Sequence, residues 1–300
     1  MVEGIKLQNV ETRKTLVIDK VSTPDYILDY VDWGAIESTH HSYKYINQVG
    51  VHITGSSLET RPIEIVGWIV ASSERDMTIR KSFLNSFFNP QQTIDLFYKD
   101  YVLSFLPNTS VKYSANEAEN NEVICKFKVN GLCPDPLFSK KNENKVAAAS
   151  TAASFHFPLI IPSKSNSPSG TFFGLRQPSL IVAITNKGSV SVGMKIVFKA
   201  KGTLVNPTLI NVNTQKFFKI NKTMQAGETI EVNTTVGEKK IQGEMNGIVN
   251  NYFKYRDLDS EWLQLNVGDN LFRYDADSNA GNLEVYIYFN DKYLEVQECY

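Results

Sequence analysis

Short apolar-rich runs separated by turn residues fill the second half of the chain, and their spacing constrains the fold more than any other feature. Roughly eight runs recur at intervals of roughly ten residues, which is typical of a β-sandwich or a jelly roll. Turn residues such as Asn186, Gly188 and Gly268 separate them. The runs cover 180–184, 194–200, 209–212, 217–220, 229–232, 261–265, 270–274 and 283–289.

Residues 43–71 predict a long antiparallel hairpin. Apolar side chains recur at every second position on either side of a turn-forming cluster at 54–57. The part that covers 63–71 is apolar on both faces, so we expect other parts of the protein or of its neighbours to cover both faces.

One stretch, 72–90, has the pattern of an α-helix. Ser73 can cap its start, and Glu74 and Asp76 suit the first turn, where the helix dipole favours negative charge. Pro90 follows the end, because proline lacks the backbone N–H that a helix needs. The apolar residues at helical spacing are Met77, Phe83, Leu84, Phe87 and Phe88.

Composition changes between the two halves. Pro134 and Pro136 interrupt the strand pattern, and the next residues are mostly lysine, asparagine, serine and alanine, with Val146 as the single large apolar residue. Such a segment is typical of a linker. We expect a mainly β protein in which an N-terminal β-sandwich-like domain carries the helix and the hairpin, and a linker leads to a C-terminal β-sandwich. The three parts are 1–138, 139–154 and 155–300.

Charge and composition exclude several classes of protein. The 300 residues carry 31 lysine and arginine against 32 aspartate and glutamate, whereas domains that grip nucleic acid usually have a basic excess. No run of about 18 apolar residues is present to span a membrane, and the first residues lack the pattern of a secretory signal. The odd set Cys125, Cys133 and Cys299 favours free thiols in a reducing compartment over a disulfide framework.

No motif for catalysis, metal binding or cofactor binding stands out. The sequence lacks a nucleophile elbow, a phosphate-binding glycine loop, a dinucleotide fingerprint and a paired-histidine zinc helix. His40 and His41 are adjacent, so in a strand they face opposite sides and do not share one metal ion. The stretch 275–281 faintly resembles the start of a calcium-binding loop. However, Ala280 stands where that loop needs glycine, and Tyr286 stands where it needs glutamate. We expect no catalytic residue, no cofactor, no metal site and hence no enzyme.

Segments in order along the chain resemble the siphophage distal tail protein family. The residues that resemble the family's N-terminal domain are Gly55, Arg61-Pro62-Ile63, Gly67, a helix begun by Glu74, and Phe87-Phe88-Asn89-Pro90. Residues 133–138 resemble the exit from that domain. The segments that resemble the family's galectin-like C-terminal domain are 186–188, 206–208, 267–270 and 285–289.

This resemblance implies a structural role. Family members form a hexameric ring at the distal end of the tail tube, between the tail tube protein and the tail-associated hub protein. The N-terminal domains form the ring and a channel that DNA passes without specific binding, and the C-terminal domains hold receptor-binding or other baseplate proteins. The resemblance places the chain in the virion, at the distal tail, with no membrane partner and with synthesis in the cytoplasm of the bacterial host.

Under this reading the hairpin contributes to the contact between subunits. Strands with apolar residues on both faces need cover, and closing a ring removes open strand edges. The residues that we assign to the subunit contact are Tyr43, Tyr45, Val49, Val51, Arg61, Ile63 and Ile65.

One alternative function is a carbohydrate-binding adhesion module that contacts the host cell wall. Its candidate stacking residues are Tyr252, Phe253, Tyr255 and Trp262. The competing interpretation is that these rings fill the space between two sheets. The set of residues with which galectins bind sugar is not found, because His156 and Trp262 stand isolated, and the short loops leave no room for an inserted carbohydrate-binding module.

A second alternative is a glycan-cleaving enzyme. Such an enzyme needs two carboxylates roughly 5–10 Å apart in a groove. The spacing of Glu59, Glu64 and Asp95 does not single out such a pair.

Overall fold

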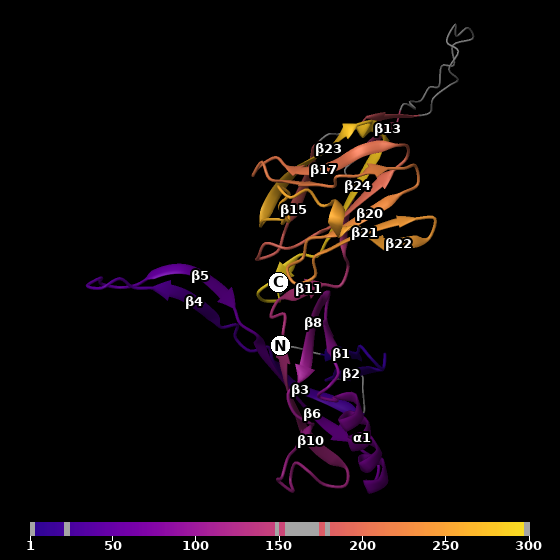
Figure 1. Ribbon diagram of the computed structural model, residues 1–300. Helices are drawn as coiled ribbons and strands as arrows, with labels where there is room; N and C mark the ends of the chain where they lie inside the picture. Colours follow the sequence, from indigo (N-terminus) through magenta and orange to yellow (C-terminus); the bar gives the residue numbers. More distant parts are fainter. Residues whose placement is uncertain (1–3, 21–24, 148–149, 154–173, 178–180, 297–300) are drawn as a thin grey trace. The chain divides into compact units, whose positions relative to one another are not determined.

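Strands make up almost all of the regular structure (Figure 1). Within the described residues, α1 (Glu74–Phe87) is the one α-helix, so the predicted mainly β fold class is confirmed. The computed structural model describes residues 4–20, 25–147, 150–153, 174–177 and 181–296.

Contacts divide the chain into two units. The first comprises residues 1–141 together with 293–300, and the second comprises residues 142–292. Residues 293–296 therefore belong to the first unit, although their sequence predicts that they belong to the C-terminal domain.

The first unit is built on a ten-stranded sheet. β8 also pairs with β10, placing Leu106 opposite Leu132, and this pairing closes the strands between them into a barrel. In sheet order the strands are β25 (Lys292–Tyr293), β11 (Phe138–Lys140), β8 (Tyr101–Pro107), β7 (Ile94–Tyr98), β1 (Gly4–Asn9), β2 (Thr15–Asp19), β3 (Tyr26–Asp32), β6 (Arg61–Val70), β10 (Ile124–Cys133) and β9 (Lys112–Tyr113).

Side chains at every second position of the strands point inward and fill the interior of this barrel. Along β10, Cys125, Phe127 and Val129 are buried and the residues between them are partly exposed. A Cβ added to Gly131 would lie 2.4 Å from the ring of Phe105, so only glycine lets the two strands pack this closely.

The helix forms as its sequence predicts. The Ser73 side chain accepts a hydrogen bond from the backbone N–H of Asp76 at 3.3 Å, which caps the first turn. Met77, Leu84 and Phe87 are buried in the core of the first unit.

The predicted hairpin of residues 43–71 is wrong. The strand β5 (His52–Leu58) pairs with β4 (Ser38–Tyr43), so 44–51 form the connection, while β6 pairs with β3 and β10. The cluster at 54–57, which we predicted as the turn, lies inside β5. The chain reverses instead where Asn47 and Gly50 adopt positive φ angles, a conformation that glycine and asparagine tolerate.

The second unit is a sandwich of two sheets around one core. The six-stranded sheet has the order β12 (Asn144–Ala147), β24 (Leu283–Phe289), β16 (Lys195–Ala200), β20 (Thr229–Asn233), β21 (Lys240–Met245) and β22 (Ile248–Asn251). The five-stranded sheet contains β15 (Ile181–Asn186), β23 (Gly268–Ser278), β17 (Leu204–Asn211) and β18 (Phe217–Lys219), with β19 (Thr223–Met224) paired to β17. Inward-facing residues of both sheets, such as Phe198 and Phe272, share the core.

Four short elements complete the described part of the second unit. They are the strand pair β13 (Ser150–Ala153) and β14 (Gly174–Gln177), and the 3₁₀ turns η1 (Phe253–Tyr255) and η2 (Ala280–Asn282). Two sequence expectations differ from the observed strands. The run 261–265 makes an isolated bridge through Leu265 rather than a strand, and the pair β21–β22 was not expected.

The segment 139–154, expected as a linker, contains strands. β12 pairs with β24, because Val146 packs against the core of the second unit. Residues 148, 149 and 154 lie outside the described residues. The division into 1–138, 139–154 and 155–300 stays a prediction.

Candidate functional site

The strands β4 and β5 form a two-stranded arm of exposed residues (Figure 1). We use the name arm for residues 38–58. At its tip, Ile46 is 93% exposed and Val49 is 99% exposed. Among the strands that the structure describes, β4 and β5 pair only with each other. The ring of Tyr43 contacts Tyr45 edge-on at 5.1 Å and stacks on His52 at 5.4 Å.

An exposed apolar arm is marginally stable by itself. An isolated two-stranded hairpin in water holds little free energy of folding, and contiguous exposed apolar residues mark contact surfaces. Burial of this surface contributes roughly 25 cal/mol for each Å² removed from water. The arm is therefore a surface suited to a protein partner.

The structure separates the seven residues that the sequence analysis assigns to a subunit contact. Tyr43, Tyr45, Val49 and Val51 lie on the arm with exposed side chains. Arg61, Ile63 and Ile65 lie on β6 and are buried within the first unit. Ile63 and Ile65 belong to the core of the first unit, and the assignment of all seven residues to a subunit contact stays a prediction. Ile46 and Ile53 are also exposed on the arm, and their position in the apolar run between residues 43 and 53 could have added them to the predicted set.

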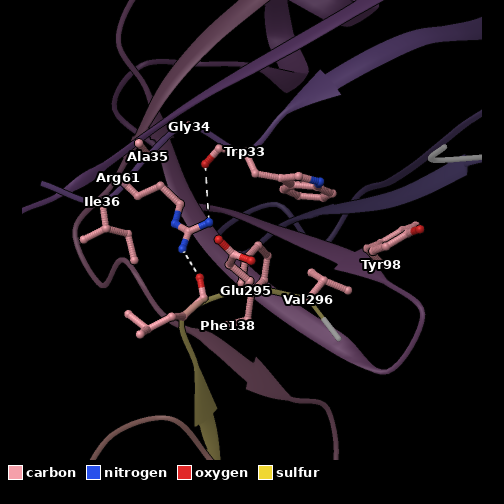
Figure 2. A pocket seen from close by; sticks show the side chains of 10 residues that line it. Trp33, Gly34, Ala35, Ile36, Arg61, Tyr98, Phe138, Glu295 and Val296 are labelled. Carbon is pink, nitrogen blue, oxygen red and sulfur yellow. Dashed lines mark hydrogen bonds between the residues drawn. The ribbon is translucent and has the colours of Figure 1, made fainter. Parts of the chain in front are cut away.

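A pocket of about 500 Å³ opens where the arm joins the barrel (Figure 2). The rings of Trp33, Tyr98 and Phe138 form its aromatic side. Trp33 packs 5.6 Å from Tyr98 and 5.4 Å from Phe138, measured between ring centroids. The other lining residues are Gly34, Ala35, Ile36, Arg61, Leu294, Glu295 and Val296.

Arg61 is the buried cation of this pocket, with 3% of its surface exposed. One terminal nitrogen donates to the backbone carbonyl of Trp33 at 3.4 Å and the other to the carbonyl of Leu294 (Figure 2). Its guanidinium carbon lies 4.7 Å from the centroid of the Phe138 ring. Burial lowers the pKa of Arg61, and the nearby charge of Glu295 opposes this effect.

The cysteines and histidines that the sequence analysis considered lie in ordinary structural positions. Cys125 and Cys133 are buried free thiols, and burial raises the pKa of Cys133 to about 12. His40 and His41 lie on the exposed strand β4. Among the described residues, no group of three His, Cys, Asp or Glu side chains is placed to hold a metal ion. Cys299 and His156 lie outside the described residues.

Two of the acidic residues, Glu64 and Asp277, form hydrogen bonds and ion pairs with neighbouring side chains. Glu64 accepts a hydrogen bond from Tyr30 at 2.7 Å and pairs with Lys128 at 2.6 Å. In the stretch 275–281, Asp277 accepts hydrogen bonds from Asn206 and Lys219, which lower its pKa.

The aromatic residues of the second unit pack on one another. Trp262 lies 5.2 Å from Phe218 and 5.8 Å from Phe253, measured between ring centroids. Cations of Lys239 and Arg256 lie over its ring at 5.3 and 5.5 Å. These contacts cover part of the indole surface that a stacked sugar would need, and Trp262 is half-buried.

In the described parts of the chain, none of the helices has the length and apolar character needed to cross a membrane.

Two family models match the chain. Residues 21–127 match the phage tail protein RIFT-related domain, and residues 187–293 match the siphovirus-type tail component, C-terminal domain. No curated protein matches the sequence at a significant level.

Solved structures share the fold. The crystal structure of SPP1 Dit (gp 19.1), described as a paradigm of the hub adsorption apparatus in Gram-positive infecting phages, matches with a TM-score of 0.66 and 12% identity over 96% of this chain and 98% of that chain. A chain of the phage P2 baseplate in its activated conformation with Ca matches with a TM-score of 0.49 and 14% identity over 99% and 100% of the two chains. At 12% identity, the likeness to SPP1 Dit concerns the fold alone.

A barrel unit and a sandwich unit that each match a tail-protein domain define a structural component of a phage tail, located in the tail of the virion. The two matches lie in the family's order and together cover most of the chain. The chain belongs to the distal tail protein family of siphophages.

Proposed function

We propose that this chain forms a closed ring, with six copies, at the distal end of a siphophage tail. The ring joins the tail tube protein to the tail-associated hub protein of the baseplate and anchors the proteins that adsorb to the host. The barrel units line a channel for DNA, and the second unit is a galectin-like attachment module. The protein acts by assembly and not as an enzyme.

The observation that carries this proposal is the exposed arm. Tyr43, Tyr45, Val49 and Val51 leave apolar surface that the described residues of the chain do not cover. A contact between the arm of one copy and a different surface of the next is heterologous, and such contacts close into rings when the rotation between copies allows it. The formal net charge of −1 supports passage of DNA without specific binding, because no overall basic excess holds the phosphates.

The alternative of a carbohydrate-binding adhesion module is less well supported. Its central residue, Trp262, is half-buried and packs against Phe218, Phe253 and two cationic side chains. This packing favours the interpretation that the aromatic residues belong to the sandwich. The test is whether the intact chain binds wall saccharide and whether a folded Trp262→Leu variant loses this binding. Both results together would support the carbohydrate-binding alternative.

The test of the ring is the mass in solution by light scattering, followed by particle images. The informative variant replaces residues 44–51 by Asn-Gly, because Tyr43 and His52 pair directly and a two-residue turn preserves their register. We expect the intact chain to form a six-fold ring and this variant to remain a monomer.

The matched control removes exposed apolar side chains elsewhere. Ile248 and Val249 are exposed on β22 of the second unit, so a double change to serine leaves the arm intact. We expect this variant to assemble as the unmodified protein does. Full rings from the shortened-arm variant would contradict the assignment of the arm to the subunit contact.

A further inference from the structure

The pocket that Arg61 lines contains a buried charge with incomplete hydrogen bonding. The Nε atom of Arg61 is buried and has no hydrogen-bond partner among the described residues. The two terminal nitrogens donate to backbone carbonyls, which carry no formal charge. Buried donors are nearly always paired, and a buried cation is normally matched by an anion. A partner that supplies the missing acceptor and the missing charge would complete this site.

The nearest acidic group does not complete it. Glu295 lies beside the guanidinium (Figure 2), and its charge acts on Arg61. However, Glu295 is exposed, and no ion pair joins it to Arg61 within the described residues. Glu295 therefore leaves Nε of Arg61 without an acceptor.

The walls of the pocket define the rest of the partner's chemistry. Trp33, Tyr98 and Phe138 provide aromatic surface, and Ile36 and Val296 provide aliphatic surface. A volume of about 500 Å³ is within the range of roughly 300–1,000 Å³ that is usual for ligand pockets. A guanidinium at one side of an aromatic cavity recognises a carboxylate that is attached to an apolar group.

We propose that this pocket docks a segment of a partner polypeptide in which a carboxylate lies next to a large apolar side chain. The carboxylate pairs with the guanidinium of Arg61, and the apolar side chain enters between Trp33, Tyr98 and Phe138. A polypeptide is the occupant because a buried cation beside apolar walls complements a carboxylate next to an apolar side chain, and because a tail protein works by binding other proteins. The inference does not depend on a ring, since every lining residue belongs to the first unit of one chain.

Arg61 also has a structural role, and this role is compatible with docking of a partner. Its terminal nitrogens tie the chain after β3 to the chain after β25. This tie does not use Nε. A purely structural Arg61 would bind no carboxylate, so binding separates the two roles.

The first experiment compares two probes on the intact protein. N-acetyl-L-phenylalanine carries the carboxylate and the apolar ring, and N-acetyl-L-phenylalaninamide keeps the ring without the charge. Isothermal titration calorimetry is expected to show that the acid binds at least tenfold more tightly than the amide, as a charge-assisted hydrogen bond predicts. Equal binding of the two probes, or no binding of the acid at millimolar concentration, overturns the proposal.

Variants then test the two charges in opposite directions. Arg61→Gln is expected to reduce the affinity for the acid about tenfold, and Glu295→Gln to raise it about two- to threefold, because a like charge beside the site is removed. Ile79→Ser, on the exposed face of α1, is the control and leaves binding unchanged. Glu295 is exposed, so its variant keeps the proposal testable even where Arg61→Gln fails to fold. Unchanged affinity in Glu295→Gln and in a folded Arg61→Gln contradicts the site.

Discussion

The guanidinium of Arg61 donates a hydrogen bond to the backbone carbonyl of Leu294, which lies 233 residues later in the chain. This bond joins the first residue of β6 to the segment that follows β25. The contact explains how the last described residues are held in the first unit, together with the edge-on packing of Tyr101 and Tyr293 at 5.5 Å.

Arg61→Ala is expected to lower the free energy of unfolding of the first unit by about 2–4 kcal/mol, because it removes both hydrogen bonds and the packing on Phe138. Arg61→Met is expected to cost about half as much, since the apolar chain keeps the packing and removes the buried charge. Urea unfolding followed by tryptophan fluorescence measures both. Equal losses in the two variants would show that packing contributes little here.

Asn9 joins β1 to the end of α1. Its buried side-chain amide donates to the carbonyl of Phe87 at 3.0 Å and to the side-chain oxygen of Gln92 at 2.9 Å. Asn9→Leu leaves these acceptors without their donor and is expected to cost about 1–3 kcal/mol of stability. Asn9→Asp is expected to cost more, because it places a negative charge beside two oxygens. Thermal unfolding ranks the variants, and a neutral Asn9→Asp would contradict this role.

The raised pKa of Cys133 predicts a loss of stability in alkali. Burial raises the thiol pKa from 9.0 to about 12, so the folded state keeps a proton that the unfolded state releases above pH 9. Stability from this group is therefore complete below about pH 9 and declines as pH rises toward about 12, by up to about 1.4 kcal/mol per pH unit. Cys133→Ala is expected to flatten this decline in urea titrations between pH 8 and pH 11, and an unchanged slope would contradict it.

Gly131 and Gly55 allow a direct comparison between a crowded and an open glycine position. A Cβ at Gly131 would meet the Phe105 ring at 2.4 Å, whereas a Cβ at Gly55 on the arm would have no atom within 4 Å. Gly131→Ala is expected to destabilise the barrel by about 1–3 kcal/mol, and Gly55→Ala is expected to leave stability nearly unchanged. Chemical unfolding of both variants measures the contrast, and similar losses would show that the close approach at Gly131 is unimportant.

Sequence patterns correctly predicted those helices and strands that are determined by residues close together in the chain. The helix starts at Glu74 because Ser73 caps it, and the run 283–289 alternates as β24 does. The pair β21–β22 was missed because its buried positions hold one large residue, Ile241, and Gly243. The Asn246-Gly247 turn between these strands, with both φ angles positive, is the signal that could have identified it.

The candidate site was predicted only in part. Tyr43 and Val49 are exposed on the arm, so their part in a subunit contact stays a prediction. Ile63 and Ile65 alternate in the same way along the sequence, yet they face the barrel core. Alternation shows that one face of a strand is apolar, but it does not show which strand lies beside it or what covers that face.

The amino-acid sequence by itself determined the mainly β class, the position of the helix and the family resemblance, because these depend on residue types and spacing within short segments. Tertiary structure decided that β5 pairs with β4, that β6 enters the barrel, and that Arg61 meets Leu294 beside an aromatic pocket. These features depend on strand pairing and burial between residues far apart in the chain, which local propensity does not encode.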